Sequence, residues 1–177
     1  MTPKLDPVCL VIRDARDDER DAMRELTLAA YEEYAAILPE AVWTGYRRQL
    51  AATLDSEGPV ERIVAQRNGA LMGSVLLFPP ATKAYGSAAL STDCPEVRLL
   101  AVGPKARGEG VGTALMNECA QRARRVGATA LGLHTMDFMR AAVRLYERMG
   151  YIRAPELDFA PAKGVLVKGY RLDLRRP

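Results

Sequence analysis

The most informative stretch of the sequence is the glycine-rich segment at residues 107–112, RGEGVG, which follows an apolar run and precedes a helical pattern. A strand that ends in such a turn and continues into a helix directs several unpaired backbone N–H groups toward one point. The positive end of the helix dipole lies at the same point. Together these features bind phosphate groups. We therefore expect an anionic ligand at this segment.

The spacing of the glycines narrows the class of phosphate ligand. A nucleoside-triphosphate loop requires GxxxxGK[ST], and no Lys-Ser or Lys-Thr follows this segment. A dinucleotide site requires GxGxxG, whereas Gly108, Gly110 and Gly112 have the spacing GxGxG. Both classes are therefore minor alternatives, beside a plain glycine-rich connection that binds nothing.

At this segment the sequence resembles the GCN5-related N-acetyltransferases (GNAT family), whose signature R/Q-x-x-G-x-G/A opens a helix after an apolar strand. Two runs, ExRLLAVxPxxRGxGVGTxL and AVRLYERMGY, are similar to the same family, so the resemblance covers about residues 60–160. It implies an α/β (α+β) fold: a mixed, mostly antiparallel sheet whose two central strands splay apart, flanked by helices. It also implies acetyl-CoA as cosubstrate, and no metal.

The resemblance also implies which residues contact the coenzyme. The backbone of Leu100, Ala101 and Val102 would pair with the pantetheine arm of acetyl-CoA. Backbone amides would hold its pyrophosphate, at Arg107, Gly108, Glu109, Gly110, Val111, Gly112 and Thr113. Met139 departs from the pattern, because many members carry an asparagine there, and we carry over no contact made by that amide.

The family's reaction implies three catalytic tasks. A neutral amine attacks the thioester directly, so a base removes a proton from the ammonium, a backbone amide near Val102 meets the oxyanion, and an acid protonates the thiolate. Glu96 matches the glutamate base of the histone acetyltransferase branch; otherwise it is an edge acid paired with Arg98 or with solvent. His134, the only histidine, is an alternative base or else a structural residue.

Tyr146 matches the family's general-acid tyrosine, in the helical pattern that ends at Gly150. The match implies contact with the coenzyme sulfur. The alternative is a packed tyrosine whose hydroxyl is satisfied elsewhere.

Acceptor groups in this fold are shaped by the first two helices and neighbouring loops. The candidates here are Tyr31, Tyr34 and Trp43, together with Tyr46 and the predicted loop at 79–95. Their spacing fits core packing equally well, so the sequence leaves both readings open.

The charge of the chain is unevenly distributed. The net charge is +3, but residues 1–40 carry ten acids and five bases, so they contribute −5 and the remainder contributes +8. The acidic part would attract a cationic amine, such as a polyamine, an amino sugar, a lysine side chain or a protein N-terminus, although acids also favour a helix N-terminus. The basic part suits coenzyme A. The net charge is too small to indicate nucleic-acid binding.

We therefore predict an acetyl-CoA-dependent N-acetyltransferase, which moves an acetyl group to a primary amine of a small molecule or protein in a ternary complex. It would be an acyltransferase for groups other than aminoacyl groups. The alternative from another class is a non-catalytic acyl-CoA-binding or sensor domain. The partners are acetyl-CoA and an amine acceptor, and we allow for a homodimer.

The elements that position these residues follow from the spacing of apolar residues. Strands are expected at 8–13, 61–66, Ala70–Phe78, Glu96–Val102, 129–134, 151–159 and 164–174. Helices are expected at 17–38, 40–54, 110–126 and 139–149, with Pro39 ending the first and Asp137 as the N-cap of the last. Asn68-Gly69 predicts a two-residue hairpin between the second and third strands.

Length and composition bound the class of protein. A chain of 177 residues, 49% hydrophobic and 27% charged, fits one domain. We expect an N-terminal strand with acceptor-side helices (1–58), an acetyl-CoA-binding core (60–160) and a C-terminal strand (161–177). No apolar run reaches 18 residues and the N-terminus is too polar for a signal peptide, so we expect a cytoplasmic protein with no membrane partner. The three cysteines form no zinc or CxxC pattern.

Overall fold

A mixed β-sheet organises the molecule. The computed structural model describes residues 9–80, 93–162 and 164–175. Within these ranges the sheet has eight strands in the order β1-β2-β3-β4-β5-β8-β6, and β7 pairs with β8. The strands are β1 (Val11–Asp14), β2 (Glu61–Arg67), β3 (Ala70–Phe78), β4 (Glu96–Val102), β5 (Ala130–Thr135), β6 (Ile152–Arg153), β7 (Phe159–Ala162) and β8 (Val165–Asp173). Only the β4–β5 pair among the described strands is parallel, which confirms the predicted mixed, mostly antiparallel sheet.

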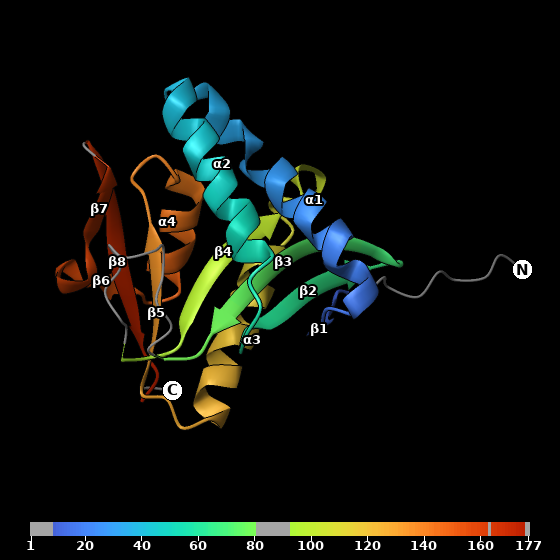
Figure 1. Ribbon diagram of the computed structural model, residues 1–177. Coiled ribbons are helices and arrows are strands. Elements are labelled where there is room, and N and C mark those ends of the chain that lie inside the picture. The colour runs from blue at the N-terminus through green and yellow to red at the C-terminus, as the bar shows by residue number, and fades with distance from the viewer. Residues whose placement is uncertain (1–8, 81–92, 163, 176–177) are drawn as a thin grey trace, which may run out of the picture.

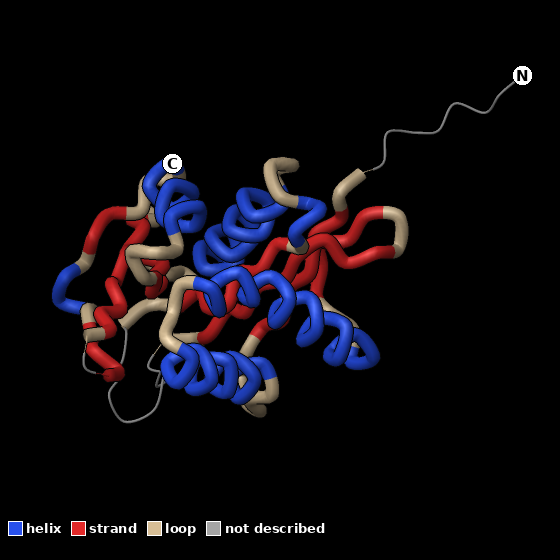
Figure 2. Tube along the Cα trace, turned by 90° about the horizontal axis from the view of Figure 1, so that it is seen from above, coloured by secondary structure: helices blue, strands red, loops and turns tan. Residues whose placement is uncertain are grey.

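Four α-helices in the described ranges cover the two faces of the sheet (Figures 1 and 2). They are α1 (Arg20–Tyr31), α2 (Glu40–Leu54), α3 (Val111–Arg125) and α4 (Arg140–Arg148). Side chains alternate between the faces of a strand, so Ile63 of β2 belongs to the core under α3 and α4 while Val64 belongs to the core under α1 and α2. This alternation gives the sheet one apolar layer on each side.

The two central strands separate soon after they meet. β4 and β5 share two register pairs, Glu96 with Gly132 and Val97 with Leu133. Beyond them β4 stays with β3, and the register shifts where Leu99 has a φ of 52°. A bulge of this kind bends one strand away from its neighbour, at a backbone cost of about 1–3 kcal/mol for a non-glycine residue. The predicted splay of the central strands is confirmed.

The hairpin between β2 and β3 is also confirmed. Its two turn residues, Asn68 and Gly69, have φ values of 51° and 79°. Both lie in the left-handed region that a two-residue hairpin requires.

The helix predicted at 17–38 is wrong in its extent. α1 is flanked by two short 3₁₀ segments, Asp17–Glu19 and Glu32–Ala36. Near the second of these, the carbonyl of Ala30 accepts a hydrogen bond from the Arg107 side chain, 3.0 Å away. A carbonyl of the last turn of α1 is therefore bonded to a side chain outside the helix, and the backbone continues there as a 3₁₀ helix, which has fewer residues per turn.

Three smaller predictions at the ends of elements are corrected. The strand predicted at 151–159 breaks into β6, a 3₁₀ segment at Pro155–Leu157 and β7, because a proline cannot donate to a ladder. Asp137 does not cap α4: Met139 is the N-cap residue, and Asp137 pairs with Lys168 at 2.7 Å. The first strand lies at Val11–Asp14 rather than 8–13, and most of the loop predicted at 79–95 falls on residues 81–92, outside the described ranges.

No helix of the described ranges is long and apolar enough to cross a membrane. The same residues hold no group of three or more His, Cys, Asp or Glu side chains that could bind a metal ion. Burial raises the pKa of the Cys119 thiol to about 12 and that of Cys94 to about 11, so both are neutral packed groups.

Candidate active site

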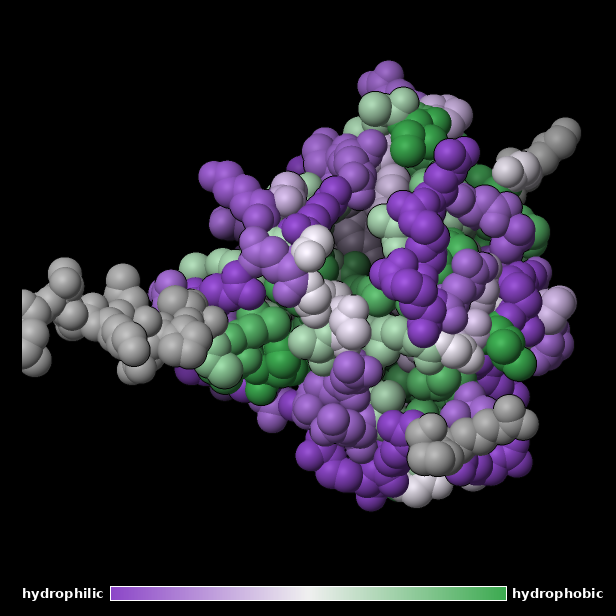
Figure 3. All heavy atoms as spheres, turned by 180° about the vertical axis from the view of Figure 1, so that it is seen from behind, coloured by the Kyte–Doolittle hydropathy of each residue, from purple (hydrophilic) through white to green (hydrophobic). Residues whose placement is uncertain are grey.

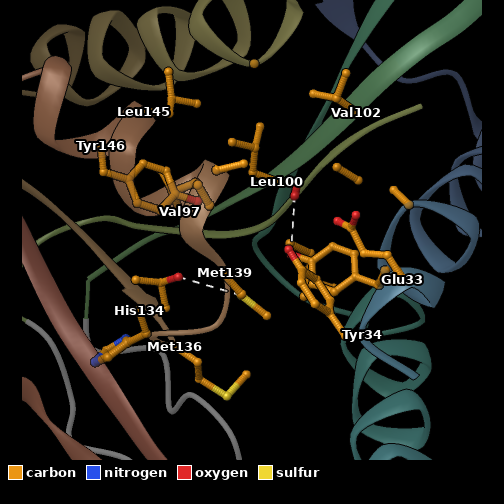
Figure 4. Close-up of a pocket in the computed structure, with 18 of the residues that line it drawn as sticks. Glu33, Tyr34, Val97, Leu100, Val102, His134, Met136, Met139, Leu145 and Tyr146 are labelled. Carbon is orange, nitrogen blue, oxygen red and sulfur yellow. Dashed lines mark hydrogen bonds between the residues drawn. The ribbon is translucent and has the colours of Figure 1, made fainter. Parts of the chain in front are cut away.

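The space between β4 and β5 is part of a cavity of about 900 Å³. Its walls come from β4, the glycine-rich segment with the first turn of α3, the end of β5, α4, α1 and α2. Figure 4 shows the side chains gathered around it. On the face opposite to that of Figure 1, polar side chains surround a hollow in which apolar residues are visible (Figure 3). One cavity thus joins the segments expected to contact coenzyme and acceptor.

The glycine-rich segment presents its backbone to this cavity. Gly108 and Gly110 have φ values of 78° and 80°, which favour glycine, and a Cβ at either would meet nothing within 4 Å. Gly110 caps α3, and its carbonyl accepts the bond from the Ala114 amide. The preceding amides of the first turn lack an intrahelical acceptor and lie at the positive end of the helix dipole. This cradle fits a pyrophosphate group.

Six of the seven predicted pyrophosphate contacts line the cavity. They are Arg107, Gly108, Gly110, Val111, Gly112 and Thr113. Glu109 is not among the lining residues, and its side chain pairs with Arg67 of β2. The Arg107 guanidinium also turns from the glycines, since it donates to Glu33 at 2.7 Å and to the Ala30 carbonyl.

The backbone of Leu100, Ala101 and Val102 forms a second wall. Ala101 and Val102 pair with β3 along one edge of β4, while β5 has already diverged from the other edge. The Tyr31 hydroxyl donates to the Leu100 carbonyl at 3.2 Å, as the dashed line in Figure 4 shows. The part of β4 expected to receive the pantetheine arm is therefore exposed to the cavity, and one of its carbonyls accepts from α1.

Glu96 lies behind the cavity wall, at the point where the strands diverge. Its side chain is 1% exposed and is not among the lining residues. Arg98 donates to one carboxylate oxygen at 2.6 Å, and the Nδ1 atom of His134 lies 2.7 Å from the other. Burial alone would raise the pKa of Glu96, but the bond with His134 and the charge of Arg98 hold it below its ordinary value. Glu96 is therefore ionised and fully engaged.

His134 has acceptors at both ring nitrogens. Besides Glu96, the Leu157 carbonyl lies 2.9 Å from its Nε2 atom. Carboxylate and carbonyl oxygens only accept, so a neutral ring can donate only one of the two bonds. His134 lines the cavity, but Figure 4 shows its ring directed away from the centre.

Tyr146 and Met139 both line the cavity. Tyr146, on α4, is 6% exposed, and Figure 4 shows its ring next to Val97. Met139 occupies the family's asparagine position, and its sulfur accepts a bond from the Thr135 hydroxyl at 3.6 Å. The thioether thus continues the apolar wall where an amide would add polar groups.

The acceptor candidates divide into two groups. Tyr31, Tyr34 and Tyr46 line the cavity, whereas Trp43 is buried and packs against Tyr46 with a ring separation of 6.2 Å. Sequence reasoning missed Glu33, which lines the cavity between two of these tyrosines. The available signal is its position between Tyr31 and Tyr34, two of the acceptor candidates.

Comparison with protein families gives one match that spans most of the chain. The family described as "Acetyltransferase (GNAT) family" matches residues 20–151. An uncharacterised N-acetyltransferase of Schizosaccharomyces pombe is 28% identical over 106 residues, which are 58% of this chain and 60% of that protein. The match therefore spans less than two thirds of that relative.

Solved structures share the fold at low sequence identity. A GNAT-family acetyltransferase from Staphylococcus aureus Mu50 superposes with a TM-score of 0.69 at 14% identity, over 94% of this chain and 99% of the other. The PaiA N-acetyltransferase of Thermoplasma acidophilum, solved in complex with coenzyme A, gives 0.67 at 12% identity over 93% and 99%. At this identity the structural likeness establishes the fold alone.

Proposed function

Since the chain belongs to the acetyltransferase (GNAT) family, we propose that it transfers the acetyl group of acetyl-CoA to the nitrogen of a primary amine by direct attack in a ternary complex. The observation that carries this proposal is the opening between β4 and β5, which connects the glycine-rich cradle to the wall formed by α1 and α2. A phosphate-bearing thioester and an amine would have access to the same cavity. Acetyl-CoA supplies the acyl group and a thiolate leaving group.

The residues present fit this cosubstrate. The amides from Gly108 to Thr113 would hold the pyrophosphate, and the backbone of β4 from Leu100 to Val102 would orient the pantetheine arm. Tyr146 would protonate the departing thiolate, because it lines the cavity beside Val97 of β4 and is shielded from bulk water.

Glu96 would act on the amine indirectly. Its carboxylate is buried behind His134 and accepts bonds from Arg98 and His134. A proton would reach it only through His134, whose Nε2 atom would first exchange the Leu157 carbonyl for water. We therefore give Glu96 the role of a positioning residue for His134.

Ligand binding tests the coenzyme assignment without requiring turnover. Acetyl-CoA and CoA should raise the melting temperature, because a ligand at 100 times its Kd stabilises the folded state by about 2.7 kcal/mol. ATP and NAD serve as controls that carry phosphates without a pantetheine arm. Selective stabilisation by ATP or NAD would contradict the assignment.

Thiol release with a panel of primary amines then tests the reaction. Release of free coenzyme A that depends on both acetyl-CoA and an amine is the expected result. Tight coenzyme binding with no release for any amine would instead support a non-catalytic acyl-CoA-binding domain.

A further inference from the structure

The part of the cavity away from the glycines is walled by aromatic and thioether side chains. They come from α1 and the following 3₁₀ segment, from α2, from the residues after β5 and from β7: Tyr31, Tyr34, Tyr46, Met136, Met139 and Phe159. The rings contact one another, with centroids 5.8 Å apart for Tyr31 and Tyr34 and 6.2 Å apart for Tyr31 and Tyr46. Such a wall favours a ligand with an apolar, ring-sized body.

One carboxylate, that of Glu33, lines the cavity among the residues that the structure describes. No other acid of residues 9–40 lines the cavity; for example, Glu19 pairs with Arg13 at 2.7 Å, and Asp14 pairs with Arg122. The attraction that the sequence suggested for a cationic amine thus reduces to a single group inside the cavity.

Glu33 is held by a partner that it can exchange. Arg107 donates to it at 2.7 Å, and the two side chains are 42% and 45% exposed. Ion pairs between groups this exposed add little stability. Arg107 belongs to the glycine-rich segment, so a polyanion bound at the amides competes with Glu33 for its charge.

The groups around Glu33 suit an ammonium ion. Figure 4 shows the Glu33 side chain beside the Tyr34 ring. Burial, together with the negative charge of Glu33, raises the pKa of Tyr34 to about 12, so this residue remains a neutral phenol. An ammonium next to the face of a tyrosine gains cation–π attraction in addition to the ion pair.

We propose that Glu33 binds the amino group of the acceptor, and that the acceptor is a small amine carrying one positive charge on an apolar, ring-sized body, as in an arylalkylamine. The proposal rests on the proposed function and specifies its substrate class. A polyamine would bring further charges without further carboxylates in the described lining. An amino sugar would place several hydroxyls against a mostly apolar wall.

Acceptor kinetics provide the first test. Thiol release is measured at saturating acetyl-CoA with 2-phenylethylamine, spermidine and glucosamine, for the wild type, Glu33→Gln and the control Glu32→Gln. Glu32 is exposed, precedes Glu33 and does not line the cavity. We expect the highest kcat/KM with 2-phenylethylamine, a KM about tenfold higher in Glu33→Gln because a charge-assisted contact is lost, and no change in Glu32→Gln. A higher kcat/KM with spermidine or glucosamine would overturn the acceptor class.

Calorimetry provides a test that does not depend on turnover. 2-Phenylethylamine is titrated into the wild type and both variants, each with and without saturating coenzyme A. We expect tighter amine binding when coenzyme A is present, and affinity about tenfold weaker in Glu33→Gln only. Equal amine affinity in the wild type and Glu33→Gln would overturn the role of Glu33, and equal affinity with and without coenzyme A would overturn the exchange of Arg107.

The two proposals fail in distinguishable ways. If the wild type does not bind coenzyme A, the proposed function fails. If coenzyme A binds and some other class of amine releases thiol, the function stands and only this inference fails. Glu33→Gln should bind coenzyme A at least as tightly as the wild type, since Arg107 is then freed; loss of that binding would contradict the exchange.

Discussion

Among single residues, Tyr146 is the side chain whose change should separate chemistry from binding. Tyr146→Phe removes one hydroxyl from the cavity wall, and loss of a general acid lowers turnover by about 100-fold or more. We expect kcat to fall by that factor while the Kd for coenzyme A stays constant. A thiol-release assay measures kcat, and calorimetry measures the Kd for coenzyme A.

Tyr151 offers a matched control for this change. Its ring lies 5.8 Å from that of Tyr146, and its buried hydroxyl has no hydrogen-bond partner among the described residues. Tyr151→Phe should leave kcat unchanged and raise stability by about 1 kcal/mol, because an unsatisfied buried group is removed. Equal kcat values for both phenylalanine variants would refute the acid role of Tyr146.

Glu96→Gln should affect stability in a pH-dependent way. Removing one partner of a buried ion pair costs about 3–5 kcal/mol at neutral pH, here because Arg98 loses its carboxylate. The pKa of Glu96 is lowered in the folded state, so its stabilising charge acts fully above its ordinary value of about 4.5 and is lost as the pH falls through the lower folded value. Urea unfolding from pH 7 to pH 3 should show the wild type losing its advantage over Glu96→Gln.

The exposed Glu25, on α1, supplies the control for that series. Glu25→Gln should stay within about 0.5 kcal/mol of the wild type across the pH range, as is usual for surface changes. A Glu96→Gln protein that is destabilised equally at pH 7 and pH 3 would contradict the ionised state of Glu96.

At this scale the sequence predicts the backbone conformation of the glycine-rich segment better than the partners of individual side chains. Glycine spacing identified the cradle, because a positive φ and a missing Cβ are properties of the residue type itself. The engagement of Glu96 with His134, and the presence of Glu33 in the cavity, depend on partners 38 and 74 positions away. No local pattern encodes such distances, so these roles required the fold.

Among the elements, β3 and α3 set how closely β4 can approach the glycine-rich segment. A Cβ at Gly73 would lie 2.8 Å from the Ala101 carbonyl oxygen and 2.9 Å from Val111. The Ala101 oxygen is a backbone atom, so it can move only if β4 moves. Gly73→Ala should therefore lower the free energy of unfolding by about 1–3 kcal/mol and weaken coenzyme binding by displacing β4 from α3. Thermal unfolding and calorimetry measure both effects.

Gly45, within α2, is the comparison for that substitution. A Cβ there would meet nothing within 4 Å. Gly45→Ala should therefore stabilise the helix by about 0.5–1 kcal/mol. If Gly73→Ala behaved like Gly45→Ala, the close packing of β3, β4 and α3 would be refuted.

Periodicity predicts the long elements and misplaces their ends. Strands β2, β3 and β4 and helices α2 and α3 lie close to where apolar spacing puts them. The first helix breaks where Ala30 accepts a bond from Arg107, and the strand predicted at 151–159 breaks at Pro155. The break in the first helix involves a residue distant in sequence, so it was not predictable. The break in the strand was predictable, because the proline is a local signal.

In the molecule as a whole, the sheet consists of two sets of strands, β1 to β4 and β5 to β8, with two register pairs between β4 and β5. Fewer shared hydrogen bonds allow the two sets to open separately. We expect hydrogen exchange of the free protein to show two classes of amide protection, one for each set. Coenzyme A should raise protection in both, and a single class unaffected by coenzyme A would contradict this.

The family's overall architecture was predictable because its signature is local, in one strand–turn–helix unit. The positions of the charged side chains in the fold were not predictable. The acidic part of the chain is one feature in the sequence, yet its members pair at separate places: Glu19 with Arg13 and Arg16, Glu33 with Arg107, and Asp14 with Arg122. Net charge over a segment does not specify which of its groups meet in space.

The opening in the sheet has a consequence for how long the protein survives in a cell. A ligand that bridges β4 and β5 supplies connections that the polypeptide itself lacks there. Proteases act on transiently opened molecules, so a few kcal/mol of ligand stabilisation changes abundance several-fold. The amount of this protein should therefore follow the supply of its coenzyme, and should fall through proteolytic degradation when the coenzyme is scarce.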